Sequence, residues 1–388
     1  MSRHFPDFIS AFEDYTSNTE APDSYRRWVG ISLVASALQR KCQFTWDEVH
    51  YPNMYIVLVG PSGVRKGSAM RPGKAILREA KVKLSSEAIT REALIQELFQ
   101  SEDLSGVAQG IKPHSSLTIY SSELTVFLGY NNVQLIMDLT DWYDCEDQWK
   151  YTLKTKPSND IQGVWVNLLG ATTPQQLRQS LPEDAIGGGL SSRTIFVFEE
   201  HKGKDVVFPF LEAKDHAFTQ RLIEDISDIG TMNGEFKFTP EFLEAYGIWH
   251  KTGKRKDFLG TFLEAYEARR PIHHLKLSTI VCASRTADMV VTKSDFLTAV
   301  KYLKAIEDKM KFTFSGMGAN PQAQILAKII GTLTSRKEIT FGELVKLYQY
   351  EAKVNDLYEM LNALRLTGNV ILGESKDGNF KITYIEEE

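Results

Sequence analysis

The sequence YIVLVGPSGVRKGS, residues 55–68, decides the fold. Five apolar, β-favouring residues run directly into Gly60, which predicts a buried strand over residues 55–59 that ends in a glycine-rich turn. Such a turn presents backbone N–H groups to a phosphate, and Lys66 adds a positive charge. The stretch therefore predicts a nucleotide site in an α/β fold, with an ordinary structural turn as the alternative.

The loop departs from the usual phosphate-binding pattern G-x-x-x-x-G-K-[ST] at two positions. Arg65 stands where the second glycine belongs, and Gly67 stands where a Mg²⁺-binding hydroxyl belongs. Ser68 supplies a hydroxyl one residue late, and it reaches the metal only if the loop shifts by one residue. Arg65 either contacts phosphate or faces solvent. The predicted nucleotide-binding residues of the loop are Gly60, Ser62, Gly63, Arg65, Lys66, Gly67 and Ser68.

Composition is that of an ordinary globular protein, with 388 residues, 43% of them hydrophobic and 24% charged. The net charge of −5 requires any nucleic-acid contact to come from local basic patches. The three cysteines have no paired spacing, which argues against a disulfide framework or a zinc site. The N-terminus has no signal-like apolar core, and no run is long enough to span a membrane, so a cytoplasmic protein is expected.

Residues 51–200 alternate short apolar runs with amphipathic stretches. Strands are expected at residues 55–59, 81–84, 117–120, 164–169 and 194–198, with helices near 68–81, 91–100, 132–142 and 174–180. Strands separated by helices predict a mostly parallel sheet covered on both faces. Pro72 suits this scheme if the first helix begins near Ser68, because proline is tolerated in a first turn.

The flanking segments, residues 1–50 and 201–315, are expected to be largely helical. After about residue 320 the pattern changes to three helices, near 322–333, 342–347 and 354–366. A β-hairpin of residues 370–372 and 380–385 is expected to follow, with its turn at Lys376, Asp377 and Gly378. Three helices and a hairpin are typical of a winged-helix domain. The chain thus divides at about residues 50, 200 and 320.

LTIYSSE, residues 117–123, is an apolar strand that ends in a carboxylate. In ATPases with an additional strand in the sheet, an acidic pair at such a point orients Mg²⁺ and polarises the attacking water. Ser122 occupies the first acidic position, and Glu123 remains as the candidate base and metal ligand. A solvated glutamate at a strand end is the alternative.

VWVNLLGATTP, residues 164–174, is a strand with polar residues near its end. Asn167 or Thr172 would contact the γ-phosphate or the water, as a sensor residue does. Thr173 is also expected to cap the helix that begins at Pro174.

GGGLSSRTIFVF, residues 187–198, delivers Arg193 from a glycine-rich run to the start of a strand. In ring ATPases such an arginine reaches the nucleotide of the neighbouring subunit and offsets charge on the γ-phosphate. The alternative is an ordinary arginine at a strand edge.

Two basic groups remain. Lys150, Lys154 and Lys156 precede a Pro-Ser-Asn-Asp turn, which suggests a hairpin that either holds DNA phosphates in a pore or is simply a solvated edge. Arg270, or its neighbour Arg269, would sense nucleotide from a helical lid, with an ordinary surface pair as the alternative.

GPSGVRKGS, LTIYSSE, VWVNLLGATTP and GGGLSSR together resemble AAA+ ATPases of phages and mobile elements, which are related to replicative helicases of the minichromosome-maintenance type. The resemblance covers roughly residues 1–315, with a winged helix after the ATPase as in those helicases. It implies a P-loop AAA+ core, a hexameric ring, ATP and Mg²⁺ as ligands, and translocation on DNA. By matching position it implies Lys66 as the phosphate lysine, Glu123 as the catalytic glutamate, Asn167 as the sensor, Arg193 as the trans-acting finger and Arg270 (or Arg269) as the lid sensor.

These expectations combine into an ATP-driven DNA helicase or translocase that acts as a ring in phage or mobile-element replication. Residues 322–388 hold 8 basic and 10 acidic residues, so the winged helix is expected to contact a partner protein or to support DNA binding weakly. One alternative is a nucleotide-binding switch or helicase loader with little turnover, which the altered Mg²⁺ positions favour. Another is a winged-helix DNA-binding regulator with a vestigial ATPase.

Overall fold

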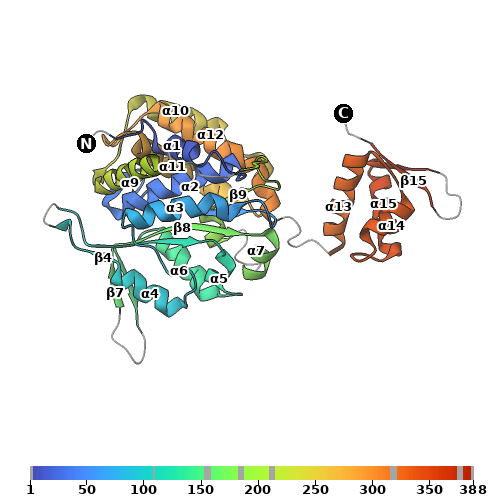
Figure 1. Ribbon diagram of the computed structural model, residues 1–388, viewed down its shortest axis with the longest axis horizontal. Helices are drawn as coiled ribbons and strands as arrows, with labels where there is room; N and C mark the ends of the chain where they lie inside the picture. The colour runs from blue at the N-terminus through green and yellow to red at the C-terminus, as the bar shows by residue number, and fades with distance from the viewer. Residues whose placement is uncertain are drawn as a thin grey trace. The chain divides into compact units, whose positions relative to one another are not determined.

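The chain is a mixed α/β protein made of two compact units, Met1–Thr313 and Phe314–Glu388 (Figure 1). The computed structural model describes residues 3–107, 110–152, 159–181, 188–208, 215–314, 321–373 and 379–385. The segments predicted for residues 1–50, 51–200 and 201–315 lie almost wholly in the first unit.

The first unit is built on a five-stranded sheet in the order β4–β5–β8–β3–β9. Four strands are parallel, and β4 joins the edge antiparallel to β5. The strands are β3 (Tyr55–Val59), β4 (Glu102–Asp103), β5 (His114–Ser121), β8 (Val164–Thr172) and β9 (Thr194–Phe198). The side chains of β3, β5 and β8 are buried throughout, as expected for parallel strands that are covered on both faces.

Helices cover both faces of this sheet (Figure 1). On one face, Asn167 of β8 bonds to Ser32 and Ser36, so α2 (Asp23–Leu38) packs there beside α3 (Lys66–Glu79). On the other face, Leu168 meets residues of α5 (Leu124–Leu128) and α7 (Pro174–Ser180), with α6 (Val133–Tyr143) alongside. Most residues of α2 are buried, so this helix belongs to the core.

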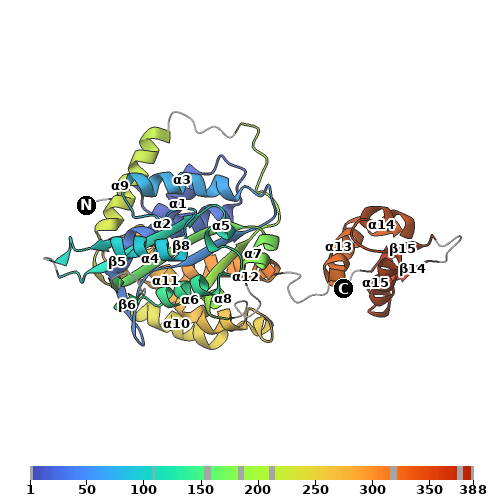
Figure 2. The ribbon, with the colours of Figure 1, turned by 90° about the horizontal axis from the view of Figure 1, so that it is seen from below.

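The remaining helices complete the first unit (Figure 2). They are α1 (Phe8–Tyr15), α4 (Arg91–Gln100), α8 (Gly189–Arg193), α9 (Asp215–Thr231), α10 (Pro240–Thr252), α11 (Glu264–Arg285) and α12 (Lys293–Met310). Short 3₁₀ turns lie at Gln39–Lys41, Lys256–Phe258 and Lys311–Phe314. Two small ladders pair β1 (Cys42–Thr45) with β2 (Val49–His50) and β10 (Gly234–Glu235), and β11 (Lys237–Phe238) with β12 (Val290–Val291).

Three predictions about these elements need correction. The strand expected at residues 81–84 is wrong: Lys81 turns the chain with a φ of 59°, and only Leu84 bridges to the sheet. Residues 42–50 hold β1 and β2 rather than helix. Helix α3 begins two residues early, so Pro72 lies inside it and offers no N–H to the Ser68 carbonyl.

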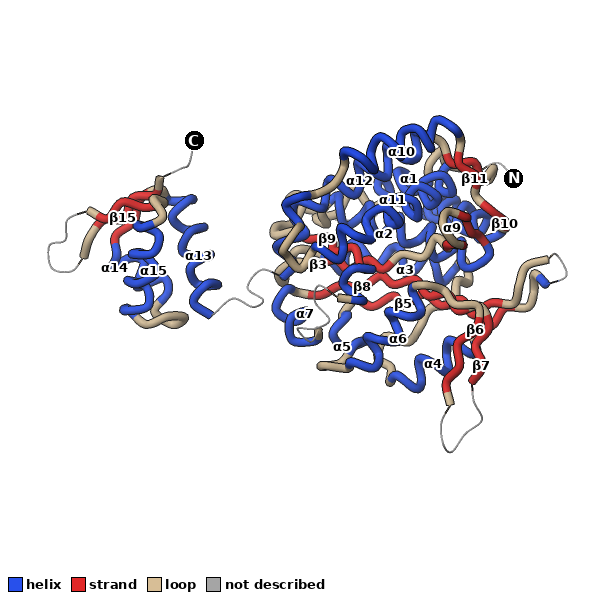
Figure 3. The backbone as a smooth tube through the Cα atoms, turned by 180° about the vertical axis from the view of Figure 1, so that it is seen from behind, coloured by secondary structure: helices blue, strands red, loops and turns tan. Residues whose placement is uncertain are grey.

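An antiparallel pair, β6 (Gln148–Tyr151) and β7 (Asn159–Gln162), projects from the α/β core (Figure 3). A hairpin was predicted here, although β7 begins earlier than expected and is separate from β8. Lys154 and Lys156 lie outside the described residues.

The second unit combines three helices with a three-stranded antiparallel sheet in the order β13–β15–β14. Its elements are α13 (Pro321–Arg336), β13 (Glu338–Thr340), α14 (Phe341–Tyr348), α15 (Val354–Leu366), β14 (Val370–Leu372) and β15 (Lys381–Tyr384). Their apolar faces enclose a core that includes Ile329, Leu344, Leu361 and Ile382. The predicted pairing of β14 with β15 is confirmed, β13 was missed, and the predicted turn at residues 376–378 lies outside the described residues.

Candidate functional site

The glycine-rich loop joins the end of β3 to the start of α3, as the sequence predicts. A Cβ at position 60 would lie 2.3 Å from the Glu199 carbonyl oxygen and 2.6 Å from the Tyr25 hydroxyl, so only glycine fits there. At Gly63, with a φ of +91°, and at Gly67 a Cβ would meet nothing within 4 Å. The loop is therefore tight against the core at one end and open along the rest.

Arg65 has the backbone conformation that the standard pattern reserves for glycine. Its φ is 66° and its ψ 28°, in the left-handed region, and it stands at the N-cap of α3. For an ordinary residue this conformation costs about 1–2 kcal/mol. The Arg65 Nε lies 2.6 Å from a Glu20 carboxylate oxygen, and Glu20 also pairs with Lys202. The loop thus keeps its usual path, and the Arg65 guanidinium is held by Glu20.

Lys66 is the first residue of α3 and folds back over the loop. Its Nζ donates to the carbonyl oxygens of Gly60, at 2.6 Å, and Pro61, at 2.9 Å. Burial lowers the pKa of Lys66, and the carboxylate of Glu123 opposes that shift. Lys66 and Glu123 therefore interact, although they are far apart in the sequence.

The carboxyl ends of three neighbouring strands meet beside this loop. Glu123 is exposed and follows β5, and Thr172 ends β8 in register with Val59 of β3. The Gly60 N–H lies 3.3 Å from the Thr172 carbonyl oxygen. The end of the sheet where β3, β5 and β8 finish thus brings together open glycine backbone, an ammonium group, a carboxylate and a threonine. This carboxyl end of the strands is here called the loop edge. Its groups suit a phosphate and a water molecule.

The two serines of the loop differ in position. Ser62 is exposed at the loop tip, and Ser68 is half-buried in the first turn of α3. Consecutive helical residues point about 100° apart, so Ser68 does not take the direction that a side chain at Gly67 would have.

Asn167 does not reach the loop edge. It pairs with Thr118 of β5 and precedes the residue of β8 that pairs with Tyr55, so it lies in the middle of β8, level with the start of β3 and away from the loop, and it is fully buried. Its Oδ1 accepts from the Met54 N–H, and its Nδ2 donates to the Ser32 and Ser36 hydroxyls. The predicted sensor is therefore a core residue, and Thr172 is the residue of β8 that stands beside the loop.

Arg193 lies at the opposite end of the sheet from the loop edge, where β3 and β9 begin. It directly precedes Thr194, which pairs with Tyr55 at the start of β3. The length of β3, about 13 Å, separates that point from the loop. Arg193 therefore cannot contact a phosphate held by the loop of its own subunit.

Asp144 binds the Arg193 side chain. The Arg193 Nη2 donates to Asp144 Oδ2, and its Nη1 donates to the Gly189 carbonyl oxygen at 3.0 Å. Arg269 of α11 lies 3.4 Å from Asp144 Oδ1. These three residues, Asp144, Arg193 and Arg269, are here called the arginine cluster.

Arg270 is not in this cluster. Its guanidinium is buried and makes two hydrogen bonds to Glu307 of α12, at 2.6 and 2.8 Å. It joins two helices, and Arg269 is the member of the pair that remains accessible.

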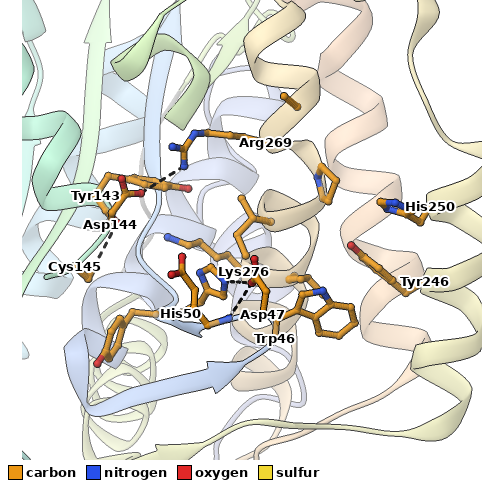
Figure 4. Close-up of a pocket in the computed structure, with 16 residues that line it drawn as sticks. Trp46, Asp47, His50, Tyr143, Asp144, Cys145, Tyr246, His250, Arg269 and Lys276 are labelled. Carbon is orange, nitrogen blue, oxygen red and sulfur yellow. Dashed lines mark hydrogen bonds and ion pairs between the residues drawn. The ribbon is translucent and has the colours of Figure 1, made fainter. Parts of the chain in front are cut away.

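Figure 4 shows a cavity beside the arginine cluster, of about 370 Å³. Trp46, Asp47 and His50 line it from the β1–β2 ladder, and Tyr246 and His250 from α10. Lys276 of α11 is buried in its wall, where its Nζ donates to Asn53 at 2.7 Å and lies 3.9 Å from the centre of the Tyr143 ring. Burial lowers the pKa of Lys276 to about 8.

The described strands of the projecting pair are not strongly basic. The Lys150 Nζ lies 3.6 Å from the Asp160 carboxylate on the opposite strand, and both side chains are exposed. A Lys150 phosphate contact would therefore compete with this ion pair.

Among the described residues, no group of three histidine, cysteine, aspartate or glutamate side chains could hold a metal ion. A Mg²⁺ that arrives with a nucleotide needs no such cage, because phosphate oxygens and water supply most of its ligands. Of the two side chains predicted to hold the metal, Glu123 is exposed beside the loop and suits it, whereas Ser68 does not take the direction of the usual hydroxyl. The helices within the described ranges include none that is long and apolar enough to cross a membrane.

Comparison with the models of known protein families and with curated proteins finds no match for this chain. The functional argument therefore rests on the geometry of the loop edge and the arginine cluster. Sequence reasoning missed Glu20, Tyr25 and Asp144, because each acts through a partner at least 30 positions away and belongs to no local pattern.

Proposed function

We propose that this protein is an ATPase that works as a ring of identical subunits, with DNA as its track. The observation that carries the proposal is the separation of two half-sites. Lys66 and Glu123 both lie at the loop edge, and Arg193 lies at the opposite end of the same sheet. A ring would bring the arginine of one subunit to the loop of the next, and six subunits is the number that the resemblance implies.

The strand order supports this proposal. β8 lies between β3, which leads into the loop, and β5, which leads to Glu123. The inserted strand is what distinguishes ATPases of the additional-strand type, in which the loop and the acid flank a gap wide enough for the γ-phosphate and a water. AAA+ ATPases belong to that type.

Each residue has a defined task in the proposed reaction. The loop N–H groups and Lys66 would hold the phosphates, and Lys66 would exchange its two carbonyl partners for phosphate oxygens. Glu123 would accept a proton from the attacking water, and Thr172 would orient that water. Arg193 and Arg269 of the neighbouring subunit would offset the charge that develops on the γ-phosphate. Glu123 would help to hold the Mg²⁺ that accompanies the nucleotide, and the metal would neutralise negative charge on the phosphates.

The second unit has the element order α–β–α–α–β–β of a winged-helix domain. Its acidic balance favours a partner protein of the replication machinery over DNA as its main contact. Its part in the proposed motor would be recruitment.

A switch or helicase loader with little turnover is the second candidate. It is favoured by the missing hydroxyl at Gly67, by Ser122 in place of an acid, and by Lys66 being engaged with Gly60 and Pro61. It would share the loop edge with the motor but not depend on Arg193.

The test is ATP hydrolysis with and without single-stranded DNA, measured together with the native mass. The motor predicts a ring whose turnover rises with DNA. Rings that bind ATP but show no turnover with any nucleic acid would support the switch. A chain that binds no nucleotide would overturn both candidates.

A further inference from the structure

We propose that Asp144 is an internal substitute for the phosphate, which holds Arg193 and Arg269 withdrawn until a nucleotide-loaded neighbour takes them over. The inference rests on the proposed function and adds a regulatory step to it. Asp144 is a positioning residue in this scheme, because it acts only through the two arginines.

Each nitrogen of the Arg193 guanidinium already donates a hydrogen bond within its own chain. Asp144 accepts hydrogen bonds from its Nε and Nη2, and the Gly189 carbonyl accepts from its Nη1. Only 11% of the Arg193 side chain is exposed, whereas a residue that projects toward a neighbour would be largely solvated. Arg193 must therefore leave Asp144 before it can contact a phosphate in another subunit.

The backbone around Arg193 is fixed while the side chain can exchange partners. The Nε2 of the buried His273 lies 3.0 Å from the carbonyl oxygen of Ser192, the preceding residue. Asp144 is 41% exposed in its side chain, so its pair with Arg193 borders solvent and a second anion can approach. A change of the Arg193 rotamer, with its Cα in place, is therefore enough to move the guanidinium from Asp144 to another anion.

Asp144 would not be left unpaired after Arg193 departs. Arg269 already lies 3.4 Å from its Oδ1, and the buried Lys276 ammonium also interacts with it (Figure 4). Tyr143 lies between these cations, with Lys276 over its ring at 3.9 Å and Arg193 at 6.0 Å. Because other cations remain beside this carboxylate, the departure of Arg193 leaves no unpaired charge, which lowers the free-energy cost of exchanging Asp144 for an incoming phosphate.

The experiment is ATP turnover as a function of subunit concentration for the full-length chain and for Asp144→Asn. The variant should lower the concentration for half-maximal turnover about fivefold, as expected when one partly exposed ion pair is removed, and should leave the melting temperature within a degree or two of the parent. Asp141→Asn removes the same charge from an exposed position one turn earlier on α6 and should change neither quantity. In an Arg193→Ala background, Asp144→Asn should have a smaller effect, because only Arg269 remains for Asp144 to hold.

Two results would overturn this inference alone. Turnover that falls at every concentration in Asp144→Asn, as in Arg193→Ala, would place Asp144 in the active arrangement. An unchanged half-maximal concentration would show that the ion pair restrains nothing. By contrast, a wild-type chain whose turnover does not depend on subunit concentration would overturn the trans role of Arg193, and this inference would fall with it.

Discussion

The two ends of the central sheet, the loop edge where β3 finishes and the opposite end where β3 begins, differ in their charged groups and in the contacts that these groups make. At the loop edge, Gly63 and Gly67 leave open space, Glu123 is exposed, and Lys66 is bonded only to loop carbonyls. At the opposite end, Arg193 and Arg269 both bind Asp144, and His273 fixes the adjacent backbone. The cation at the loop edge is hydrogen-bonded to neutral carbonyl oxygens, whereas the cations at the opposite end are bound to a carboxylate of the same chain. The difference teaches that, in the proposed ATPase, one chain would contain both halves of the site without being able to join them.

The largest expected effect on ATP binding and turnover comes from removing Lys66 from the loop edge. Lys66→Ala should weaken ATP binding and reduce turnover about a hundredfold or more, because a preorganised cation on the phosphates is lost. Equilibrium binding and steady-state hydrolysis measure this. Arg71→Ala, which removes an exposed cation from the same helix, should leave both near wild type, and an equal loss there would mean that α3 as a whole had been disturbed.

Substitutions at Asn167 and Thr172 test which part of β8 belongs to the site. Thr172→Val should reduce turnover about tenfold or more with little change in stability, because it alters a group at the loop edge. Asn167→Ala should lower the free energy of unfolding by about 2 kcal/mol, because it leaves buried partners on α2 and β3 unsatisfied.

Urea unfolding and turnover per folded molecule distinguish the two variants. A turnover loss confined to Asn167→Ala would restore that residue as the sensor and contradict the assignment of Thr172.

Acid should lower the free energy of unfolding in part through His273, which contacts the backbone beside Arg193. Burial lowers the pKa of His273 to about 3, well below its ordinary value of 6.5. Between these values the unfolded chain binds more protons than the folded one, so stability falls as the pH drops below about 6.5. One such histidine contributes a slope of about 1.4 kcal/mol per pH unit.

Unfolding free energies at pH 7, 6 and 5 measure that slope. His273→Gln keeps a side-chain donor for the Ser192 carbonyl without a group that titrates there, and it should flatten the slope. His201→Gln, at an exposed position, should not. Equal slopes in the parent and in His273→Gln would contradict the role of His273.

Gly67→Thr should have the smallest effect on turnover, and it should improve turnover at low Mg²⁺ rather than reduce it. A Cβ at this position meets nothing within 4 Å, so the hydroxyl of the standard pattern can be added without a clash. Half-maximal turnover should then need a few-fold less Mg²⁺, and the melting temperature should rise slightly, because glycine is a poor helix residue. Gly67→Ala adds the Cβ without the hydroxyl, so an equal gain from both variants would exclude metal binding as the cause.

What the sequence could predict was local. The strand, the loop and α3 could be predicted because Tyr55–Val59 and the glycines are contiguous, and Glu123 comes soon after the β-favouring run Leu117–Tyr120. Asn167 was misplaced because the sequence does not show how far β8 extends past Leu169 toward the loop edge. Arg269 and Arg270 are neighbours, but consecutive helical residues point about 100° apart, so the first contacts Asp144 and the second Glu307. The arginine cluster itself depends on α6, α8 and α11 meeting, which only the tertiary structure shows.

The most direct test of this account of the two ends mixes Lys66→Ala subunits with Arg193→Ala subunits. Each variant alone should be nearly inactive. In mixed rings, a subunit with an intact loop edge can lie beside one with an intact Arg193, so the account predicts that part of the turnover returns. Mixed rings of confirmed composition that stay as inactive as either variant alone would contradict the claim that Arg193 completes its neighbour's site.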